Sequence, residues 1–157
     1  IEDGIDHTRS HGIAVADFDH DGDLDVIVGH SRARCGGADD CYPTQQIRMF
    51  ENTLSDTSNY FALELVGGAG SNRAAIGARI TVAGEDGTTQ TRQVDGGHGH
   101  YGAQHDLVQH LGLGSACRAN VTVRWPDAAL TSETHELVSG YRYRWVQGQA
   151  PVVVEQP

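Results

Sequence analysis

The feature that most constrains this chain is an acidic loop at residues 17–25. Its sequence is DFDHDGDLD, in which five aspartates occupy alternate positions and one glycine stands between the third and the fourth. Five carboxylates this close repel one another unless a cation lies between them. Ca²⁺ is the natural partner, because it takes about six to eight oxygen ligands in a flexible shell. The loop therefore predicts a calcium site.

The spacing within the loop assigns the predicted ligands. Asp17, Asp19 and Asp21 would bind by their carboxylates, Asp23 by its backbone carbonyl and Asp25 by a side-chain oxygen. Gly22 lies where the chain must turn sharply, often at positive φ. The alternative is a solvated acidic turn without metal.

The residues on either side of the loop predict strands rather than the helices of an EF-hand. An EF-hand needs a bidentate glutamate at the position that Val28 occupies. Apolar and β-branched residues alternate after the loop, and residues 13–16 form another short apolar run before it. The predicted unit is a strand, a calcium loop and a second strand.

Two sets of motifs resemble known families. Residues 12–26 resemble the calcium-binding FG-GAP repeat of integrin-type β-propellers. Downstream motifs resemble the ASPIC/UnbV domain, which commonly follows FG-GAP repeats in secreted bacterial proteins and in a cartilage acidic protein family. The downstream motifs are Ser71-Asn72-Arg73, Ile76–Arg79, Gly97–Tyr101, His110–Gly114 and Val123–Pro126. The resemblance covers about residues 12–147 and implies an all-β, extracellular, calcium-binding module, without implying a chemistry.

Short alternating segments between turn formers predict an all-β fold. Strands are expected at residues 47–52, 61–66, 78–83, 88–94, 121–125, 133–137, 141–146 and 152–155, with residues 105–111 as the only helix candidate. We predict an incomplete propeller-blade-like calcium hairpin in residues 1–55, packed on a C-terminal β-sandwich in residues 56–157. The first residues read like the middle of a sequence, so a processed or truncated form is expected.

An isolated blade would expose two sheet edges, which suggests that this chain pairs with other molecules. The first hypothesis is a secreted, calcium-stabilised structural or adhesive module that assembles with its own copies into a fibre, for example through residues 151–157. The second is calcium-dependent binding of carbohydrate or protein, with Trp125, Trp145, Tyr141 and Tyr143 as stacking surfaces. An enzyme is not expected, because no Gly-x-Ser-x-Gly elbow or other catalytic constellation occurs.

Composition restricts the partners. The formal net charge of −10 argues against nucleic acid or an anionic membrane surface. No apolar run approaches the roughly 20 residues needed to span a bilayer. A calcium site and a disulfide would both place the chain outside the cytoplasm.

Three cysteines are present. Cys35 and Cys41 flank a short loop rich in turn formers, which favours a disulfide between them. Two free thiols are the alternative, and a zinc pair fits the spacing poorly. Cys117 has no evident partner and is expected to be a small buried residue.

Two further sites are candidates. His98, His100, His105 and His110 lie close together in sequence and could ligate Zn²⁺ or Cu²⁺. The alternative is surface and turn histidines that bond to the backbone. Asn120 begins an Asn-Val-Thr sequon for N-linked glycosylation at the start of a predicted strand.

Overall fold

The computed structural model describes residues 10–30, 46–53, 58–97 and 102–155. Its regular elements are strands, and no α-helix occurs among these residues, which confirms the all-β prediction. No helix in this part of the chain is therefore long and apolar enough to cross a membrane. The strands are β1 (Ser10–Ala16), β2 (Asp25–His30), β3 (Ile47–Phe50), β4 (Asn59–Val66), β5 (Arg79–Gly84), β6 (Thr89–Gln93), β7 (Gln109–Gly114), β8 (Arg118–Arg124), β9 (Ser132–Val138), β10 (Arg142–Val146) and β11 (Val152–Glu155).

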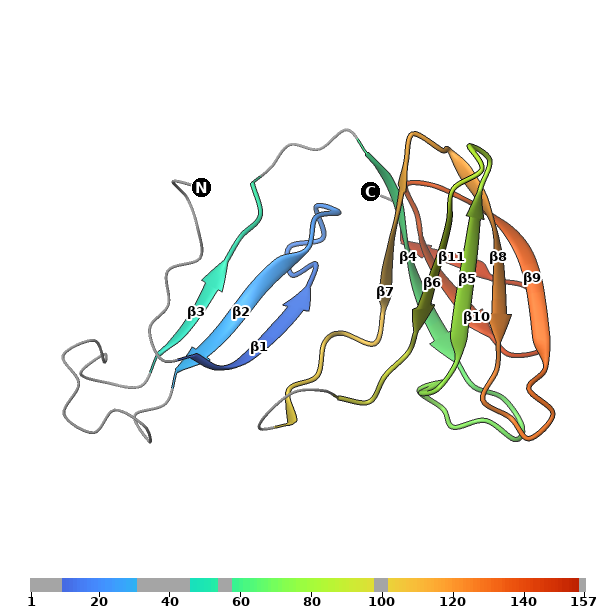
Figure 1. Ribbon diagram of the computed structural model, residues 1–157, viewed down its shortest axis with the longest axis horizontal. Helices are drawn as coiled ribbons and strands as arrows, with labels where there is room; N and C mark the ends of the chain where they lie inside the picture. The colour runs from blue at the N-terminus through green and yellow to red at the C-terminus, as the bar shows by residue number, and fades with distance from the viewer. Residues whose placement is uncertain (1–9, 31–45, 54–57, 98–101, 156–157) are drawn as a thin grey trace. The chain divides into compact units, whose positions relative to one another are not determined.

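The chain divides into two compact units (Figure 1). Unit 1 comprises Ile1–Leu54 and Gly97–Asp106, and unit 2 comprises Ser55–Gly96 and Leu107–Pro157. The second segment of unit 1 thus comes from the connection between β6 and β7.

Unit 1 contains a three-stranded antiparallel sheet in the order β1-β2-β3. The register places Val15 opposite Val26 and Ile27 opposite Met49. The acidic loop joins β1 to β2, as the sequence predicts, and Ala16 and Asp25 pair at its two ends. The predicted strand, loop and strand are confirmed.

The second segment of unit 1 lies along the outer edge of β1. The backbone N–H of Val15 donates to Nδ1 of His105 at 3.0 Å. The N–H of Asp106 donates to the carbonyl of Val15 at 3.5 Å. Since both bonds fall on one residue of β1, this segment covers part of an edge that the hairpin alone would expose.

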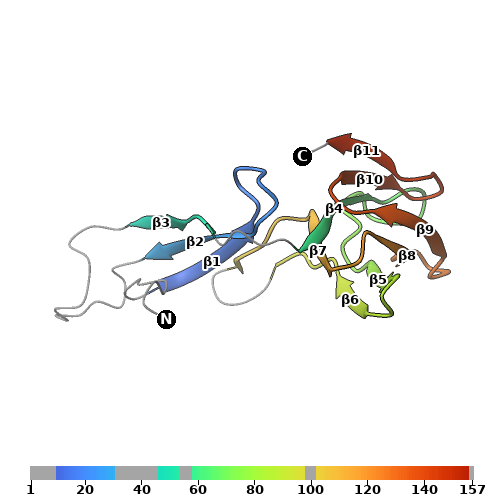
Figure 2. The ribbon, with the colours of Figure 1, turned by 90° about the horizontal axis from the view of Figure 1, so that it is seen from above.

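Unit 2 is a β-sandwich of two four-stranded sheets. One sheet has the order β11-β10-β4-β7 and the other β6-β5-β8-β9. Figure 2 shows β10 and β11 in one layer and β5 and β6 in the other. Alternate residues of both sheets form one apolar core, in which Phe61, Trp125 and Trp145 are fully buried. The predicted sandwich is confirmed.

The helix candidate at residues 105–111 is wrong. Its C-terminal part belongs to strand β7, which pairs with β4. Leu111 and Leu113 are buried, whereas Gly112 and Gly114 between and after them are exposed. This alternation has the period of a strand, and two glycines disfavour a helix.

Cys117 is exposed, so its predicted burial is also wrong. It lies in the turn between β7 and β8, where the neighbouring Ala116 fills the inward position at 2% exposure. The backbone N–H of Cys117 donates to the Glu85 carboxylate at 2.8 Å. The predicted disulfide between Cys35 and Cys41 lies outside the described residues and stays a prediction.

Candidate metal centre

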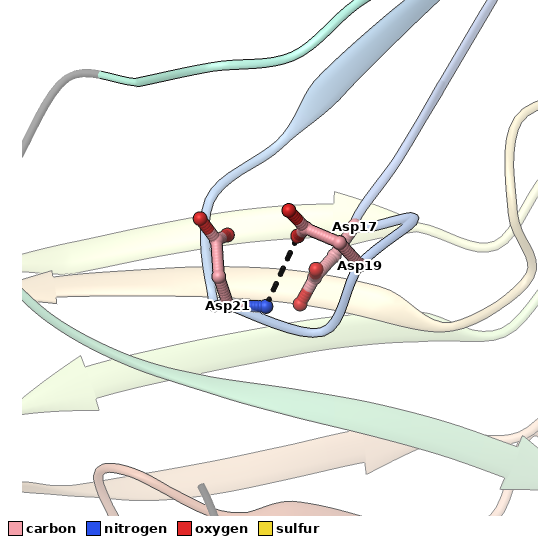
Figure 3. Close-up of side chains that lie close together, drawn as sticks. All are labelled: Asp17, Asp19 and Asp21. Carbon is pink, nitrogen blue, oxygen red and sulfur yellow. Dashed lines mark hydrogen bonds between the residues drawn. The ribbon is translucent and has the colours of Figure 1, made fainter.

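The acidic loop brings three carboxylates together between the end of β1 and the start of β2. One carboxylate oxygen from each of Asp17, Asp19 and Asp21 lies within 4.8 Å of the other two (Figure 3). Asp17 is half-buried, and Asp19 and Asp21 are exposed. Among the described residues, this is the only such group of three or more histidine, cysteine, aspartate or glutamate side chains.

The separation of these oxygens suits a calcium ion. Two oxygens that bind one Ca²⁺ at about 2.4 Å each can lie no more than about 4.8 Å apart. The oxygens of this cluster lie within 4.8 Å of one another, so one ion could contact all three. An all-oxygen donor set also favours a hard cation over the transition metals that prefer imidazole or thiolate.

Electrostatic repulsion makes the same cluster unfavourable without a cation. The carboxylate oxygens of the cluster lie no more than 4.8 Å apart. At that separation two unit charges repel by about 1 kcal/mol in water and about 3 kcal/mol at an effective dielectric of about 20. Three carboxylates contain three such pairs. A divalent ion between them would replace this repulsion with attraction.

The backbone of the loop is shaped by its own side chains. The N–H of Asp21 donates to Oδ1 of Asp19 at 3.2 Å, and the N–H of Asp23 donates to Oδ1 of Asp21 at 2.9 Å. Such bonds two residues apart are typical of Asx turns. Gly22 has φ of 100°, which confirms the predicted positive value, and His20 has φ of 65°, which sequence reasoning missed.

Asp25 has a structural role that its spacing did not reveal. It is 1% exposed, its Oδ2 accepts the N–H of Phe18 at 3.0 Å, and its Oδ1 accepts the N–H of Asn52 at 2.8 Å. It therefore ties the acidic loop to the chain that follows β3. Each carboxylate oxygen has a further lone pair, so these bonds are compatible with the predicted metal contact. Asp23 and Asp25 are outside the three-residue cluster, and their roles as ligands stay predictions.

Two of the four candidate metal-binding histidines are described, and they belong to different units. His105 belongs to unit 1 and accepts the Val15 N–H. His110 belongs to unit 2, where its ring stacks on Tyr60 with centroids 4.6 Å apart. His98 and His100 lie outside the described residues, so a transition-metal site stays a prediction.

The aromatic residues proposed for carbohydrate stacking are mostly internal. Trp125 and Trp145 are 0% exposed and Tyr143 is 7% exposed, while Tyr141 packs against the same core. Their burial favours a structural over a stacking role. Asn120 is exposed on β8, between Ala83 and Glu136 of the neighbouring strands, where a glycan would have access.

The sequence that follows the acidic loop and β3 identifies the family. The profile described as ASPIC and UnbV matches residues 68–151, which is more than half of the chain. The chain belongs to the ASPIC and UnbV family. The profile begins after the acidic loop, so the FG-GAP likeness of the loop remains a resemblance.

Similar proteins include the same protein from two vertebrates. Cartilage acidic protein 1 of Mus musculus is 29% identical over 126 residues, covering 80% of this chain and 18% of the mouse protein. Cartilage acidic protein 1 of Homo sapiens is 30% identical over 124 residues, covering 79% of this chain and 17% of the human protein. This family member therefore spans less than a fifth of the length of these relatives.

Proposed function

We propose that this chain is a calcium-stabilised structural module of an extracellular protein. The observation that supports it best is the convergence of the Asp17, Asp19 and Asp21 carboxylates within 4.8 Å. Calcium would neutralise the loop and fix the angle at which β2 leaves β1. Asp25 would transmit this order to β3 through the N–H of Asn52.

The extracellular location is supported by two arguments. Relatives named for cartilage are 29% and 30% identical to this chain over most of its length, although it spans only a fraction of theirs. A site of a few carboxylates in an extracellular module typically binds calcium with a Kd of about 10⁻⁴–10⁻³ M. Such a site would be filled where calcium is millimolar. We propose a structural role rather than carbohydrate stacking because the large aromatic side chains fill the core.

The test is a thermal denaturation series in calcium and in chelator. Asp19→Ala and Asp21→Ala should each lower the unfolding temperature of unit 1 in calcium and change it little in chelator. Asp86→Ala is the matched control, since Asp86 is an exposed aspartate in a turn of unit 2. Equal losses in both conditions would show that the loop aspartates are not ligands.

We further propose that copies assemble through exposed strands. β11 lies at the edge of its sheet, and Val152, Val153 and Val154 are 55%, 46% and 44% exposed. β3 is also an edge strand, with Ile47 80% and Met49 49% exposed. Apolar edge strands readily accept a strand from another molecule. A head-to-tail contact of this kind gives an open fibre unless its rotation closes a ring.

Light scattering tests the assembly. A large particle that shrinks on chelation would support a calcium-dependent contact, and deleting residues 151–157 or 1–12 should release a monomer. Leu130→Ser is a control, because Leu130 is 54% exposed but lies in a turn. Polymers that survive both deletions, or a monomer under all conditions, would contradict strand exchange.

A further inference from the structure

Two arginines lie directly opposite each other on the outer face of unit 2. Arg79 in β5 is in register with Arg124 in β8, and these are the two central strands of their sheet. The next residue in β5, Ile80, and the preceding residue in β8, Val123, are both 0% exposed and point into the core. Because side chains alternate along a strand, Arg79 and Arg124 point outward, and both are exposed.

This pair differs from the other cross-strand pairs on the same face. Arg118 Nη1 lies 3.3 Å from Oε1 of Glu136, and the hydroxyls of Thr122 and Thr134 lie 2.9 Å apart. Arg79 and Arg124 have neither a hydrogen bond nor an ion pair with any side chain in the part of the chain that is described. Like charges directly opposite each other destabilise a sheet. The chain has an excess of carboxylates, with 21 acidic and 11 basic residues, yet none from the described residues pairs with these two arginines.

The two arginines belong to a continuous row of hydrogen-bond donors. Gln93 of β6 pairs with Arg79, and Ser132 of β9 pairs with Arg124. The row therefore crosses all four strands, and it contains no carboxylate. Strands about 4.8 Å apart give it a length of about 14 Å.

The next outward row consists of threonines. Thr81 pairs with Thr91 on one side and with Thr122 on the other, and Thr122 pairs with Thr134. A row of hydroxyl groups thus lies beside the arginine row and crosses all four strands of the sheet. Neither row contains an aromatic or large aliphatic side chain.

We propose that this face binds an acidic polysaccharide. The guanidinium groups of Arg79 and Arg124 would bind a carboxylate or sulfate group, which matches their planar donor geometry. The threonine and glutamine side chains would bond to sugar hydroxyls. A bound anion would remove the repulsion between the two cations.

Other classes of partner fit this face less well. The core of a protein interface is enriched in aromatic residues, methionine and arginine, and the two rows contain only the arginine of this set. Non-specific binding to a nucleic acid relies on several phosphate contacts, whereas the described part of this face offers two cations without a carboxylate partner, which is enough for one anionic group. Charge and hydrogen bonding together favour an anionic, hydroxylated ligand.

The test is titration of heparin, hyaluronan and neutral dextran into the full chain at low ionic strength. The wild-type chain should bind heparin and hyaluronan, and the Arg79→Gln/Arg124→Gln variant should bind both at least about tenfold more weakly. Arg144→Gln is the matched control, since Arg144 lies on the other sheet and pairs with Glu64 at 3.0 Å. It should bind as the wild type does. Equal binding by wild type and double variant, or equal binding of dextran, would overturn the proposal.

Two further measurements keep the result interpretable. Arg79→Lys/Arg124→Lys retains both charges but loses the planar donor geometry, so it should bind severalfold more weakly than wild type while keeping native tryptophan emission. Binding should be the same in calcium and after chelation, because the arginines belong to unit 2, so this proposal and the calcium proposal can fail separately. If the wild type binds no polysaccharide but self-associates, and the double variant does not self-associate, the face would instead be a contact with a second copy.

Discussion

The two units of this chain are stabilised by different means. Among the described residues of unit 2, 18 buried side chains form one apolar core, and both tryptophans are among them. Among the described residues of unit 1, the buried hydrophobic side chains are Ala16 and Val28, and the buried polar ones are Asp25 and His30. Burial of apolar area therefore accounts for the sandwich, whereas in the described part of unit 1 the strands pair by their backbones and Asp25 ties the acidic loop to the chain after β3.

The described residues of unit 1 include few buried apolar side chains for a three-stranded sheet. Few strands bury little apolar surface, so such a sheet needs another source of stability. In unit 1 a buried carboxylate accepts two backbone N–H groups, and the acidic loop brings together three carboxylates, for which we propose a divalent ion. The stability of unit 1 should therefore depend on solution conditions that leave unit 2 unchanged.

The largest expected effect is in the core of unit 2. Trp145→Ala should lower the free energy of unfolding by about 3–5 kcal/mol, because it leaves a cavity and removes a fully buried ring. The loss should be the same in calcium and in chelator. Urea denaturation followed by the emission of Trp125 measures it, with Leu130→Ala as an exposed control. A loss seen only in calcium would contradict the separation of the two units.

Chelation should act on unit 1 alone. At a calcium concentration of about 100 times Kd, binding stabilises the folded form by about 2.7 kcal/mol. Hydrogen exchange of the β1 and β2 amides should therefore quicken by up to about a hundredfold after chelation. Exchange in β5 and β8 serves as the internal reference. Equal acceleration in both units would mean that calcium stabilises the whole chain instead.

Asp25→Ala tests whether Asp25 anchors the acidic loop independently of metal binding. It leaves the N–H groups of Phe18 and Asn52 without their acceptor, and each unsatisfied buried group costs about 1–3 kcal/mol. We expect unit 1 to lose about 2 kcal/mol even in chelator. Asp23→Ala is the comparison, since only the backbone carbonyl of Asp23 is a predicted ligand. If Asp25→Ala lowers the stability of unit 1 only in calcium, Asp25 acts as a metal ligand and not as an anchor of the loop.

The smallest effect concerns the acid stability of unit 2. The hydroxyl and backbone N–H of Thr131, followed by Gln147, lower the pKa of Asp127 below its ordinary value. A lowered folded-state pKa contributes stability that is complete above the unfolded pKa of about 3.9 and is lost as the pH falls through the folded value. Asp127→Asn should therefore flatten the fall in unfolding temperature below about pH 4. A fall identical to that of wild type would show that this carboxylate contributes nothing to acid stability.

The sequence alone was sufficient for features whose determinants are local. Alternating apolar residues placed nearly every strand, since period-two burial appears directly in the order of residues. The aspartates at positions 17, 19 and 21 converge because one short loop carries all three. The helix candidate at residues 105–111 was wrong because pairing with β4 decides the structure of its C-terminal part.

Only the tertiary structure decided which distant residues meet. His105 reaches Val15 across 90 positions of sequence, and Asp25 reaches Asn52 across 27. Arg79 and Arg124 belong to separate motifs whose opposition depends on the register of β5 and β8. Spacing along a chain fixes which side of a strand a residue faces. Strand order and register fix its neighbours, because these depend on long-range pairing and on the packing of a shared core.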